Sequence, residues 1–216
     1  MRRIAPHAFA QLSPAHCLRY GARMNGGASG EACAVGALAA NSTRLCAMRW
    51  HWQPFASLSG ADLHAALALR SAVFVVEQAC VYLDPDEHDS HAHHLLGFIA
   101  GAAEAPAELA GYLRVIPPGR RYPEPSIGRV VTSARYRGVG LGRSVMREGI
   151  ARTRATYAGA AIRISAQAYL RAFYESLGFR TVSSAYLEDG IPHVEMLLDA
   201  APASDPRARA PSPRGG

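Results

Sequence analysis

Apolar and polar residues form regular patterns only in the middle of the 216-residue chain. Residues 1–47 and 201–216 are rich in small residues, Pro and Arg and show no sustained hydrophobic period. We therefore expect both to be disordered, or the first to be a non-native extension. Residues 48–200 combine helical and strand periods over an ordinary domain size. One domain is expected there, and Met48, directly before the first regular pattern, is a candidate start of translation.

The hydrophobic periods predict alternating helices and strands within this domain. A capping pattern at Ser59 is followed by helical spacing to about Gln78, and further helices are expected over about 138–157 and 168–178. This order predicts a mixed α/β layer fold, with a mostly antiparallel twisted sheet of six to seven strands flanked by about four helices. Strands are expected at RWHWQPF, LLGFIA, LAGYLRVI, IGRVVTS, AIRISA, TVSSAYL and HVEMLL, the last two joined by a turn at Asp189-Gly190.

The formal net charge of +6 belongs to the two tails. Residues 1–47 carry five Arg and one acidic residue, and residues 201–216 carry three Arg and one, which gives +4 and +2. Residues 48–200 carry fifteen Arg and fifteen acidic residues, so the domain is neutral and no basic face for nucleic acid is expected. No apolar run approaches the roughly 20 residues of a membrane helix. We therefore expect neither nucleic acid nor membrane as a partner.

Cysteine and histidine placement argues against disulfides and metal. Three cysteines precede the domain and leave Cys80 alone inside it, which suits a reducing compartment, and a cytoplasmic protein is expected. The run HDSHAHH, from His88 to His94, is compositional and lacks a distant pair of ligands. No metal site is therefore expected.

The stretch YRGVGLGRS, residues 136–144, places flexible residues at the start of a predicted helix. Glycine there lets an anion approach the unpaired N–H groups of the first turn, where the helix dipole is positive. The dinucleotide fingerprint fails because Arg143 stands where its third glycine would be, and a P-loop fails because the chain has no lysine. The stretch does fit R-x-x-G-x-G, with Arg137, Gly140 and Gly142.

About thirty residues later the chain reads AFYESLGF, and this pairing resembles the GNAT superfamily of acetyl-CoA-dependent N-acetyltransferases. The segments LRSAVFVVEQACVYLDPD, IGRVVTS and YLEDGIPHVEM are similar to its ElaA-like branch in the same order, so the resemblance covers residues 48–200. It implies a sheet splayed between the fourth and fifth strands. It also implies acetyl transfer from acetyl-CoA to a primary amine of a small molecule or protein, by direct attack in a ternary complex. We expect the protein to be a monomer or a homodimer.

The resemblance also implies the residues that hold the coenzyme. The strand carrying Val130, Val131 and Thr132 would pair with the pantetheine arm, and the following loop would bind the pyrophosphate through its N–H groups. Gln167 stands at the end of the fifth strand, where the family often has Asn, and its longer amide can make the same hydrogen bond. The residues implied in the loop are Arg137, Gly138, Val139, Gly140, Leu141, Gly142 and Arg143.

Acetyl transfer needs an acid for the departing thiolate and a neutral amine. Tyr174 occupies the position of the tyrosine acid in similar acetyltransferases, although a tyrosine there can also be a packed helix residue. For the base, Glu77 and His193 are candidates, each with a structural alternative, and ordered water is a third possibility. No acyl-enzyme is expected, because Cys80 is far in sequence from the thioester slot.

Two other functions stay open on the same residues. A degenerate acyl-CoA-binding module for sensing or protein interaction would keep the loop and lose turnover, and an acyl-homoserine-lactone synthase shares the fold.

A stretch of acidic residues precedes the strand expected at LLGFIA. We expect this stretch to be a solvated loop; the alternative is that its charge attracts a cationic amine to the acceptor site. Its members are Asp84, Asp86, Glu87 and Asp89.

Overall fold

The computed structural model describes residues 48–80, 82–100 and 107–202, and every structural statement below refers to these ranges. The expectations for residues 1–47 and for residues 203–216 lie outside them, as do Cys17, Cys33 and Cys46.

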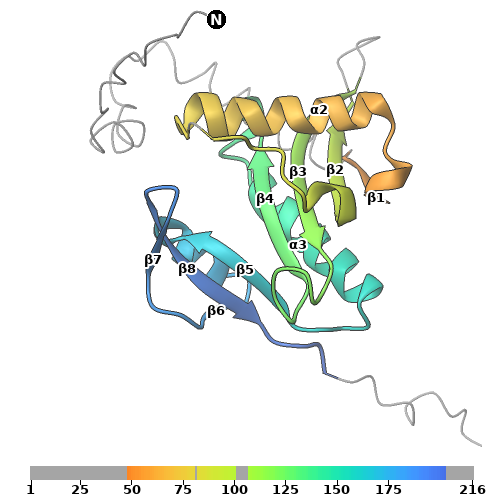
Figure 1. Ribbon diagram of the computed structural model, residues 1–216. Coiled ribbons are helices and arrows are strands. Elements are labelled where there is room, and N and C mark those ends of the chain that lie inside the picture. Colours follow the sequence, from red (N-terminus) through yellow and green to blue (C-terminus); the bar gives the residue numbers. More distant parts are fainter. Residues whose placement is uncertain (1–47, 81, 101–106, 203–216) are drawn as a thin grey trace, which may run out of the picture. The chain divides into compact units, whose positions relative to one another are not determined.

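The strands form one mixed sheet of eight strands in the order β1-β2-β3-β4-β5-β8-β6, with β7 paired to β8 (Figure 1). Neighbouring strands are antiparallel except β4 and β5, which are parallel, so the predicted mostly antiparallel sheet is confirmed. The strands are β1 (Arg49–Pro54), β2 (His93–Ile99), β3 (Glu108–Ile116), β4 (Ser126–Thr132), β5 (Ile162–Gln167), β6 (Arg180–Thr181), β7 (Tyr186–Glu188) and β8 (Ile191–Leu198).

The run TVSSAYL contributes to two short strands instead of one, which adds the eighth strand. Between β6 and β7 the N–H of Glu195 donates to the side chain of Ser183, at 2.8 Å. A serine hydroxyl there competes with the backbone for the ladder hydrogen bond, so regular pairing is interrupted. The hairpin turn was predicted correctly: Asp189 and Gly190 both have positive φ, at 51° and 77°.

Helix α2 (Gly60–Arg70) begins as predicted, because the side chain of Ser59 accepts a hydrogen bond from the N–H of Asp62 at 3.0 Å. Over Ser71–Glu77 the helix continues in π geometry and not as the single α-helix that we expected. Helix α3 is Leu141–Thr156, and α4 (Arg171–Glu175) follows a 3-10 turn at Ala168–Leu170. Within the described ranges, none of the helices has the length and apolar character needed to cross a membrane.

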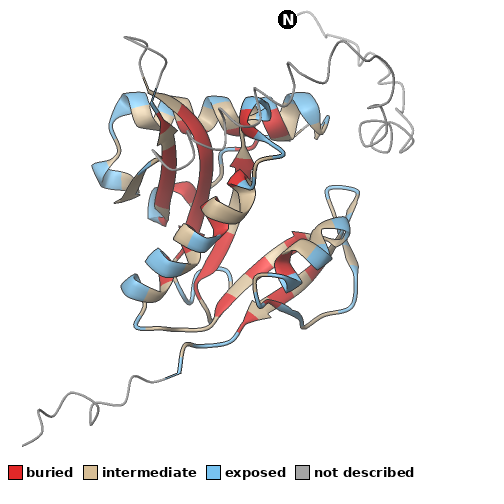
Figure 2. Cartoon of the chain, turned by 180° about the vertical axis from the view of Figure 1, so that it is seen from behind, coloured by how far each residue is buried: buried red, intermediate tan, exposed pale blue. Residues whose placement is uncertain are grey.

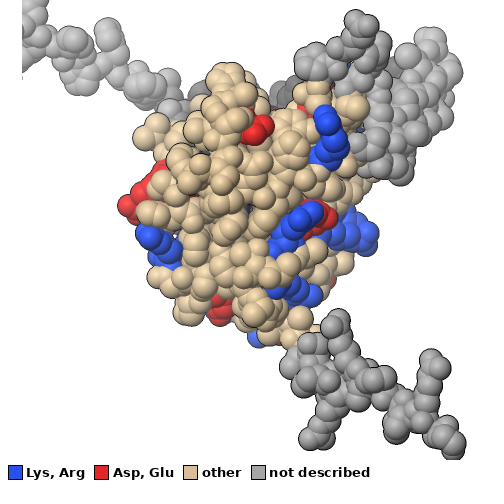
Figure 3. Space-filling model, turned by 90° about the vertical axis from the view of Figure 1, so that its right-hand side faces the viewer, with Lys and Arg blue, Asp and Glu red and all other residues tan. Residues whose placement is uncertain are grey.

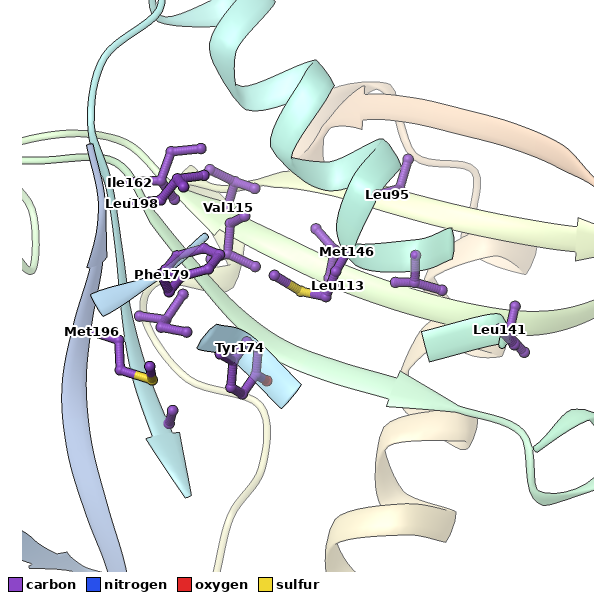
Figure 4. Close-up of a cluster of buried hydrophobic side chains, with 14 of the residues drawn as sticks. Leu95, Leu113, Val115, Leu141, Met146, Ile162, Tyr174, Phe179, Met196 and Leu198 are labelled. Atoms are coloured by element: carbon purple, nitrogen blue, oxygen red, sulfur yellow. The ribbon is translucent and has the colours of Figure 1, made fainter. Parts of the chain in front are cut away.

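The two long helices cover opposite faces of the sheet. Leu95 and Leu113 of β2 and β3 belong to the core cluster under α3, whereas their neighbours Leu96 and Tyr112 belong to the cluster under α2. Successive residues of a strand point to opposite faces, so this alternation places the helices on the two sides. The buried positions form continuous stripes on the inner strands (Figure 2), and the side chains under α3 interdigitate with those of α4 and β8 (Figure 4).

The acidic stretch is not the solvated loop that the sequence suggested. Asp84 and Asp89 are 2% and 7% exposed, and Arg70 donates to both of them at 2.8 and 2.7 Å. Arg114 donates to Asp86 and Asp89, each at 2.6 Å. Burial alone would raise the pKa of Asp89, but hydrogen bonds and charge from the two arginines outweigh it and lower the pKa to about 2. The loop is therefore tied to α2 and β3 by buried ion pairs.

Charged side chains on one face of the molecule do not merge into a single area. On the face shown in Figure 3, arginines are separated by uncharged surface and by acidic side chains.

Helix α3 approaches β3 closely at Gly149, where an added Cβ would lie 2.5 Å from the side chain of buried Leu113. We predict that Gly149→Ala lowers the free energy of unfolding by about 1–3 kcal/mol, because overpacking outweighs the better helix propensity of alanine. Denaturant unfolding measures this change. Gly60→Ala is the control, since a Cβ there meets nothing within 4 Å. Equal effects of the two substitutions would contradict the account of α3 packing.

Candidate active site

Strands β4 and β5 separate almost as soon as they meet. Their register contains one pair, Ser126 with Arg163, whereas β5 pairs with β8 at six positions. Arg163 fixes the joined end, because its guanidinium binds Glu124 at 2.9 Å and Glu195 at 2.8 Å. Beyond this point the ribbons diverge (Figure 1), which confirms the expected splay. The β5-facing edge of β4 is thereby left with backbone groups that are not used in the sheet.

A bulge lies in β4 beside this opening. Tyr112 faces Val131 and Arg114 faces Gly128, so β4 has one extra residue relative to β3. Arg129 within that interval has a φ of 50°, which is uncommon for a residue other than glycine.

The guanidinium of Arg129 connects the bulge to the buried ion pairs. It pairs with Asp84 at 2.8 Å and lies over the rings of Phe74 and Tyr82, 5.7 and 5.5 Å from their centroids. Cation–π contacts of this kind add to the ion pair. The strained residue is thus held by contacts with the π-helical segment Ser71–Glu77, with Tyr82 and with the acidic stretch.

The glycine stretch forms a turn that ends at the tip of α3. Gly138 and Gly140 have φ values of 79° and 89°, which explains why the helix begins at Leu141 and not at about residue 138 as predicted. Gly140 is the N-cap and no side chain caps the helix, so the N–H groups of the first turn lack an intrahelical partner. An added Cβ at Gly140 would meet nothing within 4 Å. The tip therefore offers converging donors and open space to an anion.

Arg137 ties this turn to the end of the first helix. Its guanidinium donates to both carboxylate oxygens of Glu77, at 2.6 and 2.9 Å, and to the carbonyl of Thr132 at 3.1 Å. Both partners of the ion pair are about two-fifths exposed. Glu77 is absent from the walls of the two cavities described next.

Two adjoining cavities occupy the opening between β4 and β5. The loop cavity is lined by seven residues, and the main cavity is lined by residues from the 74–82 segment, β4, β5, α4 and the β7–β8 hairpin. Val130, Leu170 and Tyr174 line both cavities, so the two meet at these side chains. The seven residues of the loop cavity are Val130, Val131, Thr132, Gly142, Leu170, Phe173 and Tyr174.

Tyr174 lies at this junction. It is 7% exposed, and its ring packs edge-on against Phe173 and Phe179, with centroid distances of 5.1 and 6.0 Å. Its hydroxyl points away from Phe179 and Met196 (Figure 4), and no described residue forms a hydrogen bond with it. Burial, and to a smaller extent Tyr169, raise the pKa of Tyr174 to about 12. The hydroxyl therefore stays protonated at neutral pH and is available to a ligand.

Three other residues singled out in the sequence line the main cavity. The amide of Gln167 donates to Gln78 at 3.3 Å, between the end of β5 and the end of the π-helical segment. His193 bonds through Nδ1 to the carbonyl of Ile191 at 2.8 Å. A carbonyl only accepts, so Nδ1 carries a proton and the neutral ring has its lone pair on Nε2. Cys80 also lines this cavity, so its distance in sequence does not separate it from the site.

The sequence did not single out the polar wall formed by β5 and the β7–β8 hairpin. Ser165 donates to Glu188 at 2.6 Å and lies 2.7 Å from the hydroxyl of Tyr186, and Arg121 donates to the other carboxylate oxygen of Glu188 at 3.0 Å. The period of two in YLE, next to a predicted hairpin turn, could have indicated that Tyr186 and Glu188 share a face. Nothing local indicated that Ser165 faces them.

The histidine-rich run does not form a cluster of ligands. The ring of buried His94 lies between the hydroxyl of Tyr112 at 2.7 Å and the carbonyl of Asp89 at 3.0 Å, and His93 stacks on Trp52. Within residues 48–80, 82–100 and 107–202, no three His, Cys, Asp or Glu side chains are grouped so that they could hold a metal ion.

Comparison with known proteins relates this geometry to a family. Residues 90–200 match the acetyltransferase (GNAT) domain family. A UPF0039 protein from Synechocystis is 42% identical over 72% of this chain and 97% of its own length. The crystal structure of an acyl-CoA N-acyltransferase from Pseudomonas aeruginosa is 38% identical, with a TM-score of 0.64 over 69% of this chain and 98% of that one. Escherichia coli ElaA is 34% identical, with a TM-score of 0.64 over 70% and 99%. The chain therefore belongs to the GNAT acetyltransferase family, as an ElaA-like acyl-CoA-dependent acyltransferase.

Proposed function

We propose that this enzyme transfers an acetyl group from acetyl-CoA to a primary amine of a small molecule or a protein, by direct attack in a ternary complex. The observation that supports this most strongly is the hydroxyl of Tyr174, which lies at the junction of two cavities in the β4–β5 opening and forms no hydrogen bond with any described residue. One cavity reaches Gly142 in the first turn of α3, and the other reaches the β7–β8 hairpin. A donor and an acceptor entering from the two sides would meet at this hydroxyl.

The residues present fit an acyl-CoA. The tip of α3 offers uncapped N–H groups and a left-handed Gly140 with open space around it, as a diphosphate requires. The separated edge of β4, with Val130, Val131 and Thr132, offers main-chain groups to an extended arm with amide bonds. Arg143, whose guanidinium lies over the ring of Phe173 at 5.7 Å, adds charge at the tip, whereas the charge of Arg137 is balanced by Glu77. When bound, the coenzyme supplies an activated thioester.

Tyr174 is the proposed acid. Its raised pKa favours the neutral hydroxyl, so it enters the reaction as a hydrogen-bond donor to the leaving sulfur. Complete transfer to a thiolate with an ordinary pKa near 8.5 would be uphill by about 5 kcal/mol in the free enzyme, because the two pKa values differ by roughly 3.5. We therefore assign Tyr174 the stabilisation of charge on sulfur, with the proton moving as the C–S bond breaks.

Of the candidate bases, His193 is the better placed. Its Nδ1 proton is fixed by the carbonyl of Ile191, which leaves Nε2 to accept a proton from an amine in the main cavity. Glu77 is bound through both oxygens by Arg137 and lines neither cavity. We propose that Glu77 positions Arg137 beside the glycine turn, and that Gln167 helps to shape the acceptor side through Gln78.

Release of free thiol from acetyl-CoA, measured over a panel of primary amines, tests the proposal directly. Turnover with at least one amine is expected. Coenzyme A binding without turnover across the panel would instead identify an acyl-CoA-binding module.

Cys80→Ser should retain turnover in the same thiol-release assay, because direct attack needs no thiol nucleophile. Complete loss of turnover with intact coenzyme binding would indicate an acyl-enzyme through Cys80.

Tyr174→Phe keeps the ring in its aromatic contacts and removes the hydroxyl. We predict that kcat falls by about a hundredfold, as expected for the loss of one acid–base group, while the Kd of coenzyme A stays within about threefold. Steady-state kinetics and calorimetry measure the two quantities. Unchanged kcat would remove Tyr174 from the mechanism.

Gly140→Ala tests the tip of α3. Alanine disfavours a φ of 89° by about 1–2 kcal/mol, so the turn should shift and the Kd of coenzyme A should rise by about tenfold or more. Gly119→Ala is the matched control: Gly119 has a φ of 80° and equally open surroundings, but it lies in the turn between β3 and β4, at the other end of β4. Equal coenzyme affinity in the two variants would show that the tip does not bind the diphosphate.

A further inference from the structure

Glu188 is held in one orientation on the wall of the main cavity. Its carboxylate accepts from Ser165 of β5 at 2.6 Å and from Arg121 at 3.0 Å, and the side chain remains 33% exposed. If the hydroxyl of Ser165 donates to Glu188, its oxygen is left to accept from the hydroxyl of Tyr186, at 2.7 Å. Two elements besides its own therefore fix this carboxylate, although it can still be reached from the cavity.

The carboxylate is also kept ionised. Partial burial raises the pKa of Glu188, but the Ser165 hydrogen bond and the charge of Arg121 outweigh it, so the net shift is downward. His193 contributes in the same direction when it is charged, which places its ring within electrostatic reach of Glu188. A negative charge at neutral pH thus faces the same space as the proposed base.

The hairpin geometry brings Glu188 and His193 to one face. Tyr186 pairs directly with His193 across the strands, and their rings stack with centroids 6.2 Å apart. Glu188 follows Tyr186 by two residues and therefore projects on the same side as Tyr186. An acceptor nitrogen in the main cavity can in this way contact the carboxylate and the imidazole together.

Other charges around the cavity are already committed. Arg114 and Arg129 line the wall, but both are paired with the buried aspartates behind it. Asp189, next in sequence to Glu188, also lines the main cavity, but it is exposed at the hairpin turn and no described residue forms an ion pair with it, so nothing fixes its carboxylate. Glu188 is thus an acidic group that is both oriented toward the cavity and fixed in place.

We propose, on the basis of the acetyltransferase function above, that Glu188 binds the acceptor as a primary alkylammonium and holds it for deprotonation by His193. The ammonium loses a proton to Nε2 of His193, and the freed lone pair forms the N–C bond to the acyl carbon. The C–S bond breaks, the sulfur takes the proton of Tyr174, and the acylated nitrogen loses its second proton, which restores the Tyr174 hydroxyl. His193 then releases its proton to solvent. The enzyme therefore prefers amines that are protonated at neutral pH over weakly basic aromatic amines.

The test compares Glu188→Gln with wild type for the best alkylamine of a panel and for aniline. Loss of a charge-assisted hydrogen bond should raise the KM for the alkylamine by about 10- to 100-fold, with kcat changed by less than about threefold. The Kd of coenzyme A and the kcat/KM for uncharged aniline should stay within about threefold, because neither depends on the carboxylate charge. An unchanged KM for the alkylamine would overturn the inference.

Two further variants separate position from general charge and from folding. Glu87→Gln removes an exposed acidic charge that lines neither cavity, and it should change the KM for the alkylamine by less than about threefold, since an exposed charge is screened. Ser165→Ala removes only the orienting hydroxyl and should give an intermediate rise in KM. Equal losses in Glu87→Gln and Glu188→Gln would contradict a specific role of Glu188.

The inference and the proposed function fail in different ways. If wild type turns over amines and Glu188→Gln does so with the same KM, the acetyltransferase function stands and the role of Glu188 is wrong. If wild type binds coenzyme A without turnover, calorimetry of benzylamine added to the coenzyme A complex decides the role of Glu188. Binding that is lost in Glu188→Gln supports it, and absence of binding to wild type overturns it.

Discussion

The parting of β4 from β5 after a single pair is the constraint on which the site depends. Neighbouring parallel strands normally pair their backbone N–H and C=O groups along their length. Here β5 pairs along its length with β8 only, and β4 bends through a bulge at Arg129. Arg163 locks the joined end through Glu124 and Glu195, so the opening is confined to the end that faces the tip of α3. Tyr174 then lies where the two strands have separated, at the junction of the two cavities that we propose for the coenzyme and the acceptor.

Buried ion pairs hold the wall that faces this opening. Arg70, Arg114 and Arg129 converge on the aspartates of the acidic stretch and balance their charge, which makes burial of ionised groups tolerable. They connect α2, β3 and the bulge of β4 with the segment that carries Tyr82 into the main cavity. Removing one partner would leave an uncompensated buried charge, so each ion pair of this wall depends on the others. The acidic stretch is therefore structural, although its composition alone suggested solvent exposure.

Features set by local chemistry could be predicted from the sequence, whereas features set by distant partners could not. The cap at Ser59 and the Asp189-Gly190 hairpin follow from the residues in place, and the family resemblance supplied the splay. The helix after the glycine stretch was predicted to begin about three residues too early, because the left-handed Gly138 and Gly140 were not foreseen. The π geometry after Arg70 and the burial of Asp84 and Asp89 depend on side chains far away in the chain, and one sequence does not show such pairing. For the same reason, the sequence did not indicate that Glu188 and Cys80 line the main cavity.

The central claim is that the opening between β4 and β5 receives the thioester arm while the tip of α3 holds the diphosphate. A crystal structure of the protein with coenzyme A tests this most directly. The account predicts diphosphate oxygens bonded to N–H groups within residues 138–143, and the coenzyme sulfur within hydrogen-bond distance of the Tyr174 hydroxyl. A diphosphate bound elsewhere, or a sulfur on the far side of β4 from Tyr174, would contradict it.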